Sequence, residues 1–496
     1  MSNSIKAWGA VLLWTSTAFT AVAQNEEDAL RYSSTLPGGT ARSWGMGSAM
    51  GAVGADPISA SLNPAGFGLY NTSELSFTPA FEVNDAKSIF SSTRAQEQDQ
   101  RFHFNNFALM LHHEGEKGSD WRGGTFGVSF DRQASFHWDT RAVGERVNST
   151  VLQQFANEAY GFSGADLADQ FPFTADLAYQ TYGIDPNVDT TQLDYTTAIP
   201  FGSPTRQQHT VTAGGRLNTT SIFYGTNYLD KLYLGLSIGL VSTRYERNTK
   251  HKENTLDPAV DLQELTFEER LLTTGNGVDV KFGLIGRVTE RLRLGGSFHS
   301  PMWLQLSDAY SYSMSTRFST SVDGQNSYSA TSPDGTFSYR VRTPWRALGS
   351  VAYVVGKHGV ISADYQYADQ RGSKLNAARD IIDGYDFEAE NEVIKDSFRG
   401  THSIRVGTEW RSGNWYFRAG WGVWPDAYAD NDSRQGTAYK RYTGGIGFRT
   451  DRVSIDLAGV YGQRDVVTYP YDPALVSAIT QTLTDTRGML TIAFRP

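Results

Sequence analysis

Residues 345–369, WRALGSVAYVVGKHGVISADYQYAD, have the pattern of two β-strands joined by a tight turn at GKHG. On both sides of the turn the odd-numbered positions are mostly apolar, whereas the even-numbered positions carry polar and charged side chains with a few small apolar ones. Because successive side chains of a strand point to opposite faces, this period of two predicts a sheet with one apolar face. The apolar set comprises Trp345, Ala347, Val351, Tyr353, Val355, Ile361, Ala363, Tyr365 and Tyr367. Either a protein core or a lipid bilayer can cover such a face.

The same alternation recurs along the chain, and the face opposite the apolar one carries charge. It is clearest in KLYLGLSIGLVS (231–242), NGVDVKFGLIG (276–286), THSIRVGTEW (401–410), NWYFRAGWGVW (414–424) and DRVSIDLAGVYG (451–462). A soluble sandwich would bury these charges at a cost of several kcal/mol each unless they were paired. We therefore expect the apolar face to meet lipid and the charged face to line a wet lumen. The candidate lumen charges are Arg346, Asp364, Arg405, Glu409, Arg418 and Asp456, mostly a satisfied network in which one arginine is a candidate for holding a ligand carboxylate.

The connections alternate between short turns and long polar loops, which is typical of an outer-membrane barrel. Short links include VTERLR, VGKHG, RSGN and RTDR; the long ones are expected near 137–208, 247–268, 309–335, 371–398, 425–438 and 465–484. Counting the segments predicts about fourteen strands. They are expected at 74–85, 102–113, 122–136, 208–224, 230–246, 269–288, 291–308, 336–352, 359–370, 400–412, 414–424, 439–450, 452–464 and 485–496.

Composition narrows the class of protein further. The chain has 496 residues and no cysteine, so disulfides, thiol catalysis and a lipoprotein anchor are excluded. Residues 1–23 have the pattern of a secretory signal, with an apolar stretch and Ala21-Val22-Ala23 before Gln24. A net charge of −9 with both signs interspersed argues against nucleic acid as a partner.

Residues 24–73 break the alternation and are rich in Gly, Ala and Ser. We expect short helical turns and tight loops that pack inside the barrel as a plug, or hatch. Gly45, Gly47 and Gly51 would allow the backbone to approach the wall closely. The stretch GMGSAMG is not a phosphate-binding loop, because its spacing differs, no strand precedes it and no lysine follows.

This N-terminal segment, together with TPWRALGSVAYVVGKHGVISADYQY and HSIRVGTEW, resembles the FadL/TodX family of outer-membrane transporters for long-chain fatty acids and hydrocarbons. The most specific local element is the hatch motif, Asn63, Pro64 and Ala65, beside Gly66. The resemblance implies a fourteen-stranded barrel over residues 74–496, closed by a hatch at 24–73, in the bacterial outer membrane. It also implies passive uptake, with capture among the extracellular loops, rearrangement of the hatch, and sideways exit at a kinked third strand.

Two sets of residues are candidates for steps in that route. In the expected third strand, WRGGTFGVSF, Gly123, Gly124 and Gly127 are candidates for a lateral gate, although barrel glycines also simply relieve crowding. The loop at 137–208 contains apolar residues that either line a capture groove or form a small loop core. These candidates are Phe162, Leu167, Phe171 and Phe173.

No catalytic or metal-binding arrangement is recognisable, and no enzyme, cofactor or metal is expected. His112-His113-Glu114 falls in an expected turn, where a solvated role is the default. The expected partners are membrane lipid, a hydrophobic small molecule and, with long loops available, other outer-membrane proteins. The alternative function is that of a FadL-like barrel serving as a scaffold or shuttle subunit of an outer-membrane secretion complex. An unbroken third strand and a permanently closed hatch would favour that alternative.

Overall fold

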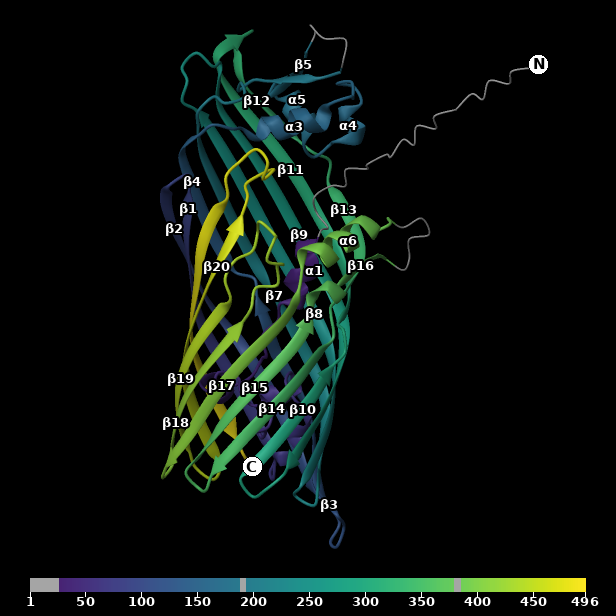
Figure 1. Cartoon of the computed structure of the whole chain (residues 1–496), viewed down its shortest axis with the longest axis vertical. Coiled ribbons are helices and arrows are strands. Elements are labelled where there is room, and N and C mark those ends of the chain that lie inside the picture. Colours follow the sequence, from purple (N-terminus) through teal and green to yellow (C-terminus); the bar gives the residue numbers. More distant parts are fainter. Residues whose placement is uncertain (1–25, 188–192, 379–384) are drawn as a thin grey trace, which may run out of the picture.

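The computed structural model describes residues 26–187, 193–378 and 385–496, so the expected signal at 1–23 lies outside the described residues. Fourteen antiparallel strands form a closed barrel, in which β1 (Glu74–Phe90) pairs with β21 (Ile479–Phe494) to complete the ring (Figure 1). The expected fold class, a fourteen-stranded barrel with an N-terminal hatch in its lumen, is confirmed.

Four strands of the wall are each built from two consecutive segments. These are β3 (Trp121–Ser135) with β4 (Trp138–Val147), β10 (Leu292–His299) with β11 (Trp303–Val322), β13 (Gly335–Arg342) with β14 (Arg346–Val355), and β15 (Gly359–Asp369) with β16 (Lys374–Ala377). The other wall strands are β2 (Thr93–Glu114), β7 (Thr205–Tyr228), β8 (Leu232–Thr255), β9 (Leu262–Arg287), β17 (Gly400–Ser412), β18 (Trp415–Trp424), β19 (Tyr439–Arg449) and β20 (Val453–Thr468). Outside the wall, β12 (Gln325–Thr331) extends β11 as a hairpin, and β5 (Ile184–Pro186) pairs with β6 (Tyr195–Thr197) in a loop.

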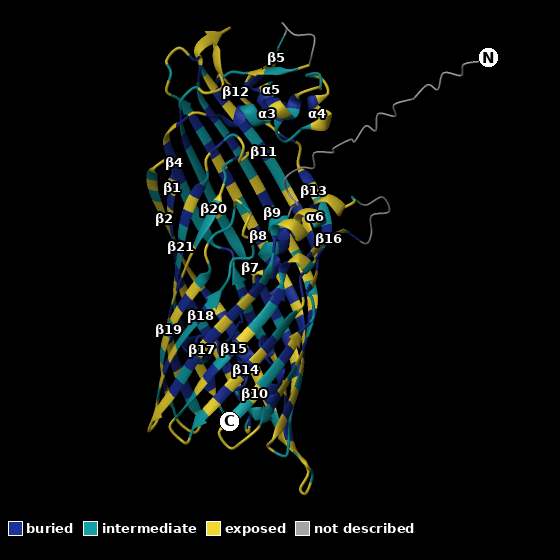
Figure 2. Cartoon of the chain, viewed as in Figure 1, coloured by how far each residue is buried: buried dark blue, intermediate teal, exposed yellow. Residues whose placement is uncertain are grey.

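Side-chain alternation in the wall follows the expected pattern, and Figure 2 shows exposed and buried residues alternating along the strands. In β14 and β15 the side chains of Tyr353, Ile361 and Tyr365 are exposed on the outer face, whereas Ser350 and Asp364 are buried in the lumen. The outer face is therefore an apolar surface suited to lipid, and the inner face carries the charges.

The wall is taller than the sequence pattern predicts. Residues 247–268 and 309–335, expected to be polar loops, are largely strands, because β8 continues to Thr255, β9 starts at Leu262 and β11 runs to Val322. Outward-facing residues in this upper part form ion pairs between strands, such as Lys250 with Glu268 at 2.7 Å. Because both faces of the wall are polar here, the alternation that reveals a strand is lost.

The hatch fills the lower lumen and is nearly all buried. It contains α1 (Glu26–Ser33), α2 (Ala41–Gly45) and two 3₁₀ helices, η1 (Pro57–Ala60) and η2 (Pro64–Leu69). The extracellular loops add α3 (Val151–Ala159), α4 (Leu167–Gln170), α5 (Ala175–Gln180), η3 (Gln370–Gly372) and α6 (Glu388–Ser397). Among the described residues, no helix is long and apolar enough to cross a membrane.

Candidate functional site: a lateral gap and the pocket behind it

The pairing between β2 and β3 stops halfway up the wall. It runs from Glu114 opposite Gly123 to Asn106 opposite Asp131 and goes no further. Above Asp131, β3 and then β4 pair with β7 alone, while residues 93–104 of β2 pair with β1 alone. The barrel wall therefore has a gap in its hydrogen bonding between β2 and the upper part of the third strand.

Irregular residues mark both lower edges of this gap. In β3 the register against β7 shifts between Arg132 and Ala134, which leaves Gln133 as an extra residue. In β2 the register against β1 shifts beside Asn105. Such bulges bend a strand and end its pairing. After Phe136 and His137 the chain continues as β4, which approaches β1 and β2 without pairing with either.

A short piece of the hatch, residues 36–39, crosses the inside of the gap and contacts both edges; we call it the strap. On the β3 side, Leu36 N donates to the Gln133 carbonyl at 3.0 Å. On the β2 side, Asn105 Nδ2 donates to the Gly39 carbonyl at 2.7 Å. A Cβ at Gly38 would lie 2.5 Å from the Asp131 Cβ, so only glycine fits this close to the wall. The strap therefore bridges the two unpaired edges.

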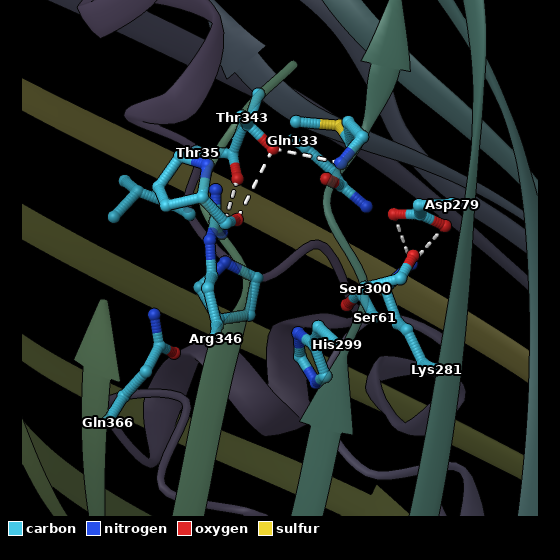
Figure 3. A pocket seen from close by; sticks show the side chains of 14 residues that line it. Thr35, Ser61, Gln133, Asp279, Lys281, His299, Ser300, Thr343, Arg346 and Gln366 are labelled. Atoms are coloured by element: carbon cyan, nitrogen blue, oxygen red, sulfur yellow. Dashed lines mark hydrogen bonds and ion pairs between the residues drawn. The ribbon is translucent and has the colours of Figure 1, made fainter. Parts of the chain in front are cut away.

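Behind the strap lies a small polar pocket of about 20 Å³, room for roughly one water molecule (Figure 3). Gln133, at the edge of the gap, is part of its lining, so the pocket adjoins the gap. The lining comes from the hatch, from β3, β9, β10, β14 and β15, and from the breaks after β10 and β13. It comprises Thr35, Leu36, Pro37, Ser61, Gln133, Asp279, Lys281, His299, Ser300, Met302, Thr343, Pro344, Arg346 and Gln366.

The two cations that line the pocket, Lys281 and Arg346, differ in their hydrogen-bond partners. Lys281 Nζ contacts both oxygens of Asp279 at 2.6 Å and is neutralised by them. Arg346 donates instead to Thr35 Oγ1 at 2.7 Å and to the Ser33 carbonyl at 2.6 Å, both in the hatch. His299 Nε2 donates to the Leu62 carbonyl at 2.8 Å. Arg346 is thus a partly buried cation whose hydrogen bonds go to neutral oxygen atoms.

The other lumen charges of the expected set are paired with one another. Arg418 contacts Glu409 at 2.6 Å and Asp456 at 2.7 Å, and Arg405 lies 3.5 Å from Asp364. Arg42 of the hatch joins this network through Glu409 at 2.9 Å. Within the described residues, Arg346 forms no ion pair, which separates it from the other arginines of the set.

The hatch motif lies against β8 and β9. Asn63 Oδ1 accepts from Ala65 N at 3.2 Å and caps η2, while Asn63 Nδ2 donates to the Leu284 carbonyl of the wall at 3.2 Å. A Cβ at wall residue Gly235 would lie 2.1 Å from the Pro64 carbonyl carbon, and one at Gly283 would lie 1.9 Å from Asn63 Oδ1. A Cβ at Gly66 would lie 2.3 Å from Ser59 Oγ, inside the hatch. The motif therefore docks the hatch closely on the wall.

The three candidate gate glycines lie below the gap rather than in it. Gly123, Gly124 and Gly127 are paired with β2 on one side and β7 on the other. The observed break in pairing with β2 begins beyond Asp131. The break in pairing lies in the third strand, where the resemblance implied a kink, but its irregular residue is Gln133, and a role of these glycines in gating stays a prediction.

The four capture-loop candidates pack into a small core above the barrel. The side chain of Leu167 is fully buried, and the ring centroids of Phe162 and Phe171 are 5.2 Å apart. Phe173 contacts the β11 residues Tyr310 and Tyr312 at 5.0 and 5.5 Å. They come together in space, with their packing fixing the loop on the wall; ligand capture stays a prediction.

No protein-family model and no curated protein matches this chain. Solved structures match it over almost its whole length. The alignment with a FadL homologue from Pseudomonas aeruginosa covers 93% of this chain and 99% of the homologue. Its TM-score is 0.55 and its sequence identity is 13%. The toluene transporters TodX from Pseudomonas putida and TbuX from Ralstonia pickettii also cover 93% of this chain and 99% of their own, at TM-scores of 0.53 and 0.51 and identities of 13% and 14%.

The chain is therefore a bacterial outer-membrane β-barrel closed by an N-terminal hatch. More particularly, it has the fold of the FadL/TodX transporters, as the sequence resemblance suggested. At these identities the likeness establishes the fold, and the neighbours that carry it are transport channels.

Proposed function

We propose that the protein mediates passive uptake of hydrophobic compounds across the outer membrane and releases them sideways through the gap between β2 and β3. The observation that carries this proposal is the strap: the gap in the wall is bridged from inside by two hydrogen bonds of residues 36–39. Moving this short segment would connect the pocket to the lipid.

Sideways release also fits the way the lower lumen is filled. Close glycine contacts at Gly235 and Gly283 and the ion pair of Arg42 with Glu409 fix the hatch to the wall over a wide area. Moving the whole hatch would break these contacts, whereas moving the strap breaks two hydrogen bonds to the wall and the close approach of Gly38 to Asp131. An apolar chain gains about 0.8 kcal/mol per CH₂ in lipid relative to water, which favours release into the bilayer.

The ligand class that we propose is an amphipathic molecule with an apolar chain and an anionic or hydrogen-bonding head group. The pocket next to the gap is polar, and Arg346 holds only neutral oxygen atoms there. A carboxylate would give this cation a stronger, charge-assisted partner than the Thr35 hydroxyl. The toluene in the names of two neighbours has no such group.

The broken third strand supports transport over the scaffold alternative, which expected an unbroken strand. The test is uptake by outer-membrane vesicles that contain the protein, with a labelled long-chain fatty acid and a labelled sugar of similar mass. We expect faster entry of the fatty acid without an energy source and no change for the sugar. Equal gains for both would indicate a polar pore, and no gain for either would contradict transport.

A further inference from the structure

Two cations face each other on the outer surface of the barrel. Arg342 of β13 and Lys374 of β16 are directly opposite in the ladder between these strands, and both side chains are exposed. Arg340 lies on the same face, two residues along β13. Directly opposite residues of an antiparallel pair have Cα atoms about 5 Å apart, and like charges there repel each other.

Within the described part of the chain, neither Arg342 nor Lys374 forms an ion pair. This differs from the outer wall formed by β8 and β9. There Lys250 pairs with Glu268 at 2.7 Å, and Lys252 pairs with Glu264 at 2.9 Å. Among the residues that the structure describes, no carboxylate offsets the repulsion between Arg342 and Lys374, which makes this surface attractive to an anion.

Exposed tryptophan side chains lie close to the two cations on the outer face of the barrel. Trp303 lies directly opposite Arg342 on the neighbouring strand β11, and Trp345 follows Arg342 by three residues, about 10 Å of extended chain. Both tryptophan side chains are exposed on the outer face. Trp345 also contacts Phe298 at 6.0 Å and Tyr367 at 5.8 Å.

An aromatic cluster of this kind marks the edge of the lipid, because Trp and Tyr concentrate at membrane interfaces. From Trp345 the outward side chains stay apolar down β14 to Tyr353, close to the short turn at 356–358. The short turns are at the end opposite the long loops, so the cluster is at the extracellular edge. Arg342 and Lys374 therefore lie just above it, at the level of lipid head groups.

Two amides complete the surface. Gln305 of β11 and Asn376 of β16 lie opposite Arg340 on either side, and both are exposed. Each amide offers donors and an acceptor to hydroxyl groups. The surface thus combines unpaired cations with neutral hydrogen-bonding groups, above an aromatic edge.

We propose that this surface binds the phosphorylated sugar head group of an outer-leaflet glycolipid, with a phosphate between Arg342 and Lys374. The amides of Gln305 and Asn376 contact the sugar, and the acyl chains lie along Trp303 and Trp345. The orientation of the glycolipid is set by the outer surface of the barrel, because the cations lie above the aromatic edge and the apolar face lies below it. This site is on the outside of the barrel and does not depend on the proposed transport.

The experiment is a native mass spectrometry titration of the full-length protein in mild detergent with diphosphorylated lipid A and with the same lipid after removal of its phosphates. The test variant is R342Q/K374Q. The matched control is K250Q/R270Q, which removes the same charge from the outer wall higher up, where the cations lie near Glu268. Heat-dependent migration in gel electrophoresis verifies that each variant is folded.

We expect the test variant to bind the diphosphorylated lipid about tenfold or more weakly, the loss of a charge-assisted contact. The control variant should bind the diphosphorylated lipid as tightly as the unaltered protein does. The unaltered protein should bind the dephosphorylated lipid as weakly as the test variant binds the diphosphorylated lipid. Equal binding of both lipids by the unaltered protein overturns the proposal even if the test variant fails to fold. So does an equal loss in both variants, or displacement of the lipid by inorganic phosphate at the same concentration.

Discussion

At the scale of single residues, glycines decide how closely the hatch and wall approach. Gly235 and Gly283 of the wall leave no room for a Cβ beside Pro64 and Asn63, and Gly407 leaves none beside the Met46 carbonyl oxygen. Wall glycines that face outward, such as Gly349, have open space around them. Glycines such as Gly235 on the inner face of the wall are therefore required for close packing against the hatch, whereas glycines such as Gly349 on the outer face have room for a side chain.

Replacing Gly235 with valine should therefore loosen the hatch. The added side chain would overlap Pro64, and overpacking of this kind typically costs about 1–3 kcal/mol. We expect a lower unfolding temperature and a higher single-channel conductance in planar bilayers. The control is Gly349→Val, which should change neither; equal effects of the two would contradict the docking role of Gly235.

Arg346→Gln tests the proposed ligand class at the pocket. Glutamine keeps a donor for the hatch but removes the positive charge that a carboxylate would contact. We expect fatty-acid uptake to fall about tenfold, while toluene uptake stays unchanged. The toluene measurement is the internal control, because damage to the channel would lower both, and an equal loss would contradict a role of Arg346 in recognising the head group.

The gate glycines illustrate what sequence reasoning reaches at this scale. It selects the third strand from WRGGTFGVSF, but the bulge at Gln133 and the contacts of residues 36–39 depend on partners far apart in the chain. Likewise, nothing in NGVDVKFGLIG distinguishes Lys281 as a pocket residue. In a Gly127→Val variant the Cβ would lie 2.1 Å from the Leu109 carbonyl oxygen. A loss of uptake in this variant would therefore not distinguish damage to the wall from a defect in gating.

At the scale of elements, the positions of all fourteen strands are predictable but their lengths are not. Period-two alternation is strong where one face meets lipid, as in β14 and β15. Above the lipid it disappears because β8 and β9 carry ion pairs on their outer face. Strand extensions there are held by pairing between distant segments, which no local pattern encodes.

The extracellular loop core is attached to the barrel beside α3 by a cluster of buried polar groups. Glu253 Oε1 accepts from Val151 N at the start of α3 at 2.8 Å and contacts His251 Nε2 at 2.9 Å. The ring of His209 lies 5.7 Å from that of His251. Burial, followed by the nearby His251 and Arg247, lowers the pKa of His209 to about 3, so His209 stays uncharged in the folded state.

This attachment should weaken as the pH falls. We expect opening of this attachment to expose His209. The residue then regains a pKa near 6.5 and binds a proton that the folded form rejects, so the stability of the attachment is full above pH 6.5 and falls by about 1.4 kcal/mol per pH unit below it. Hydrogen exchange of residues 151–159, corrected for intrinsic rates, should therefore speed up from pH 7 to pH 5. H209Q should remove most of this dependence, and an unchanged slope in H209Q would contradict the assignment to His209.

At the scale of the whole molecule, the barrel is closed below by a hatch, and the pairing of its wall is interrupted between β2 and the third strand. Most of the hatch is held by glycine contacts and by the ion pair of Arg42 with Glu409, whereas residues 36–39 bridge the gap with two hydrogen bonds and the close approach of Gly38 to Asp131. This difference in attachment distinguishes residues 36–39 from the rest of the hatch, and the proposed release requires only these residues to move. The plug itself is predictable from the break in alternation at residues 24–73, but this division depends on contacts in three dimensions.

The most direct test of sideways release is to lock the strap to the third strand. The chain has no cysteine, so L36C/Q133C introduces a single pair at positions joined by a backbone hydrogen bond. The control, G459C/G488C, joins two directly opposite residues of β20 and β21 in the closed wall. We predict that oxidation abolishes fatty-acid uptake in the first variant, that reduction restores it, and that the control transports in both states. Undiminished uptake by fully oxidised L36C/Q133C would contradict release through the gap.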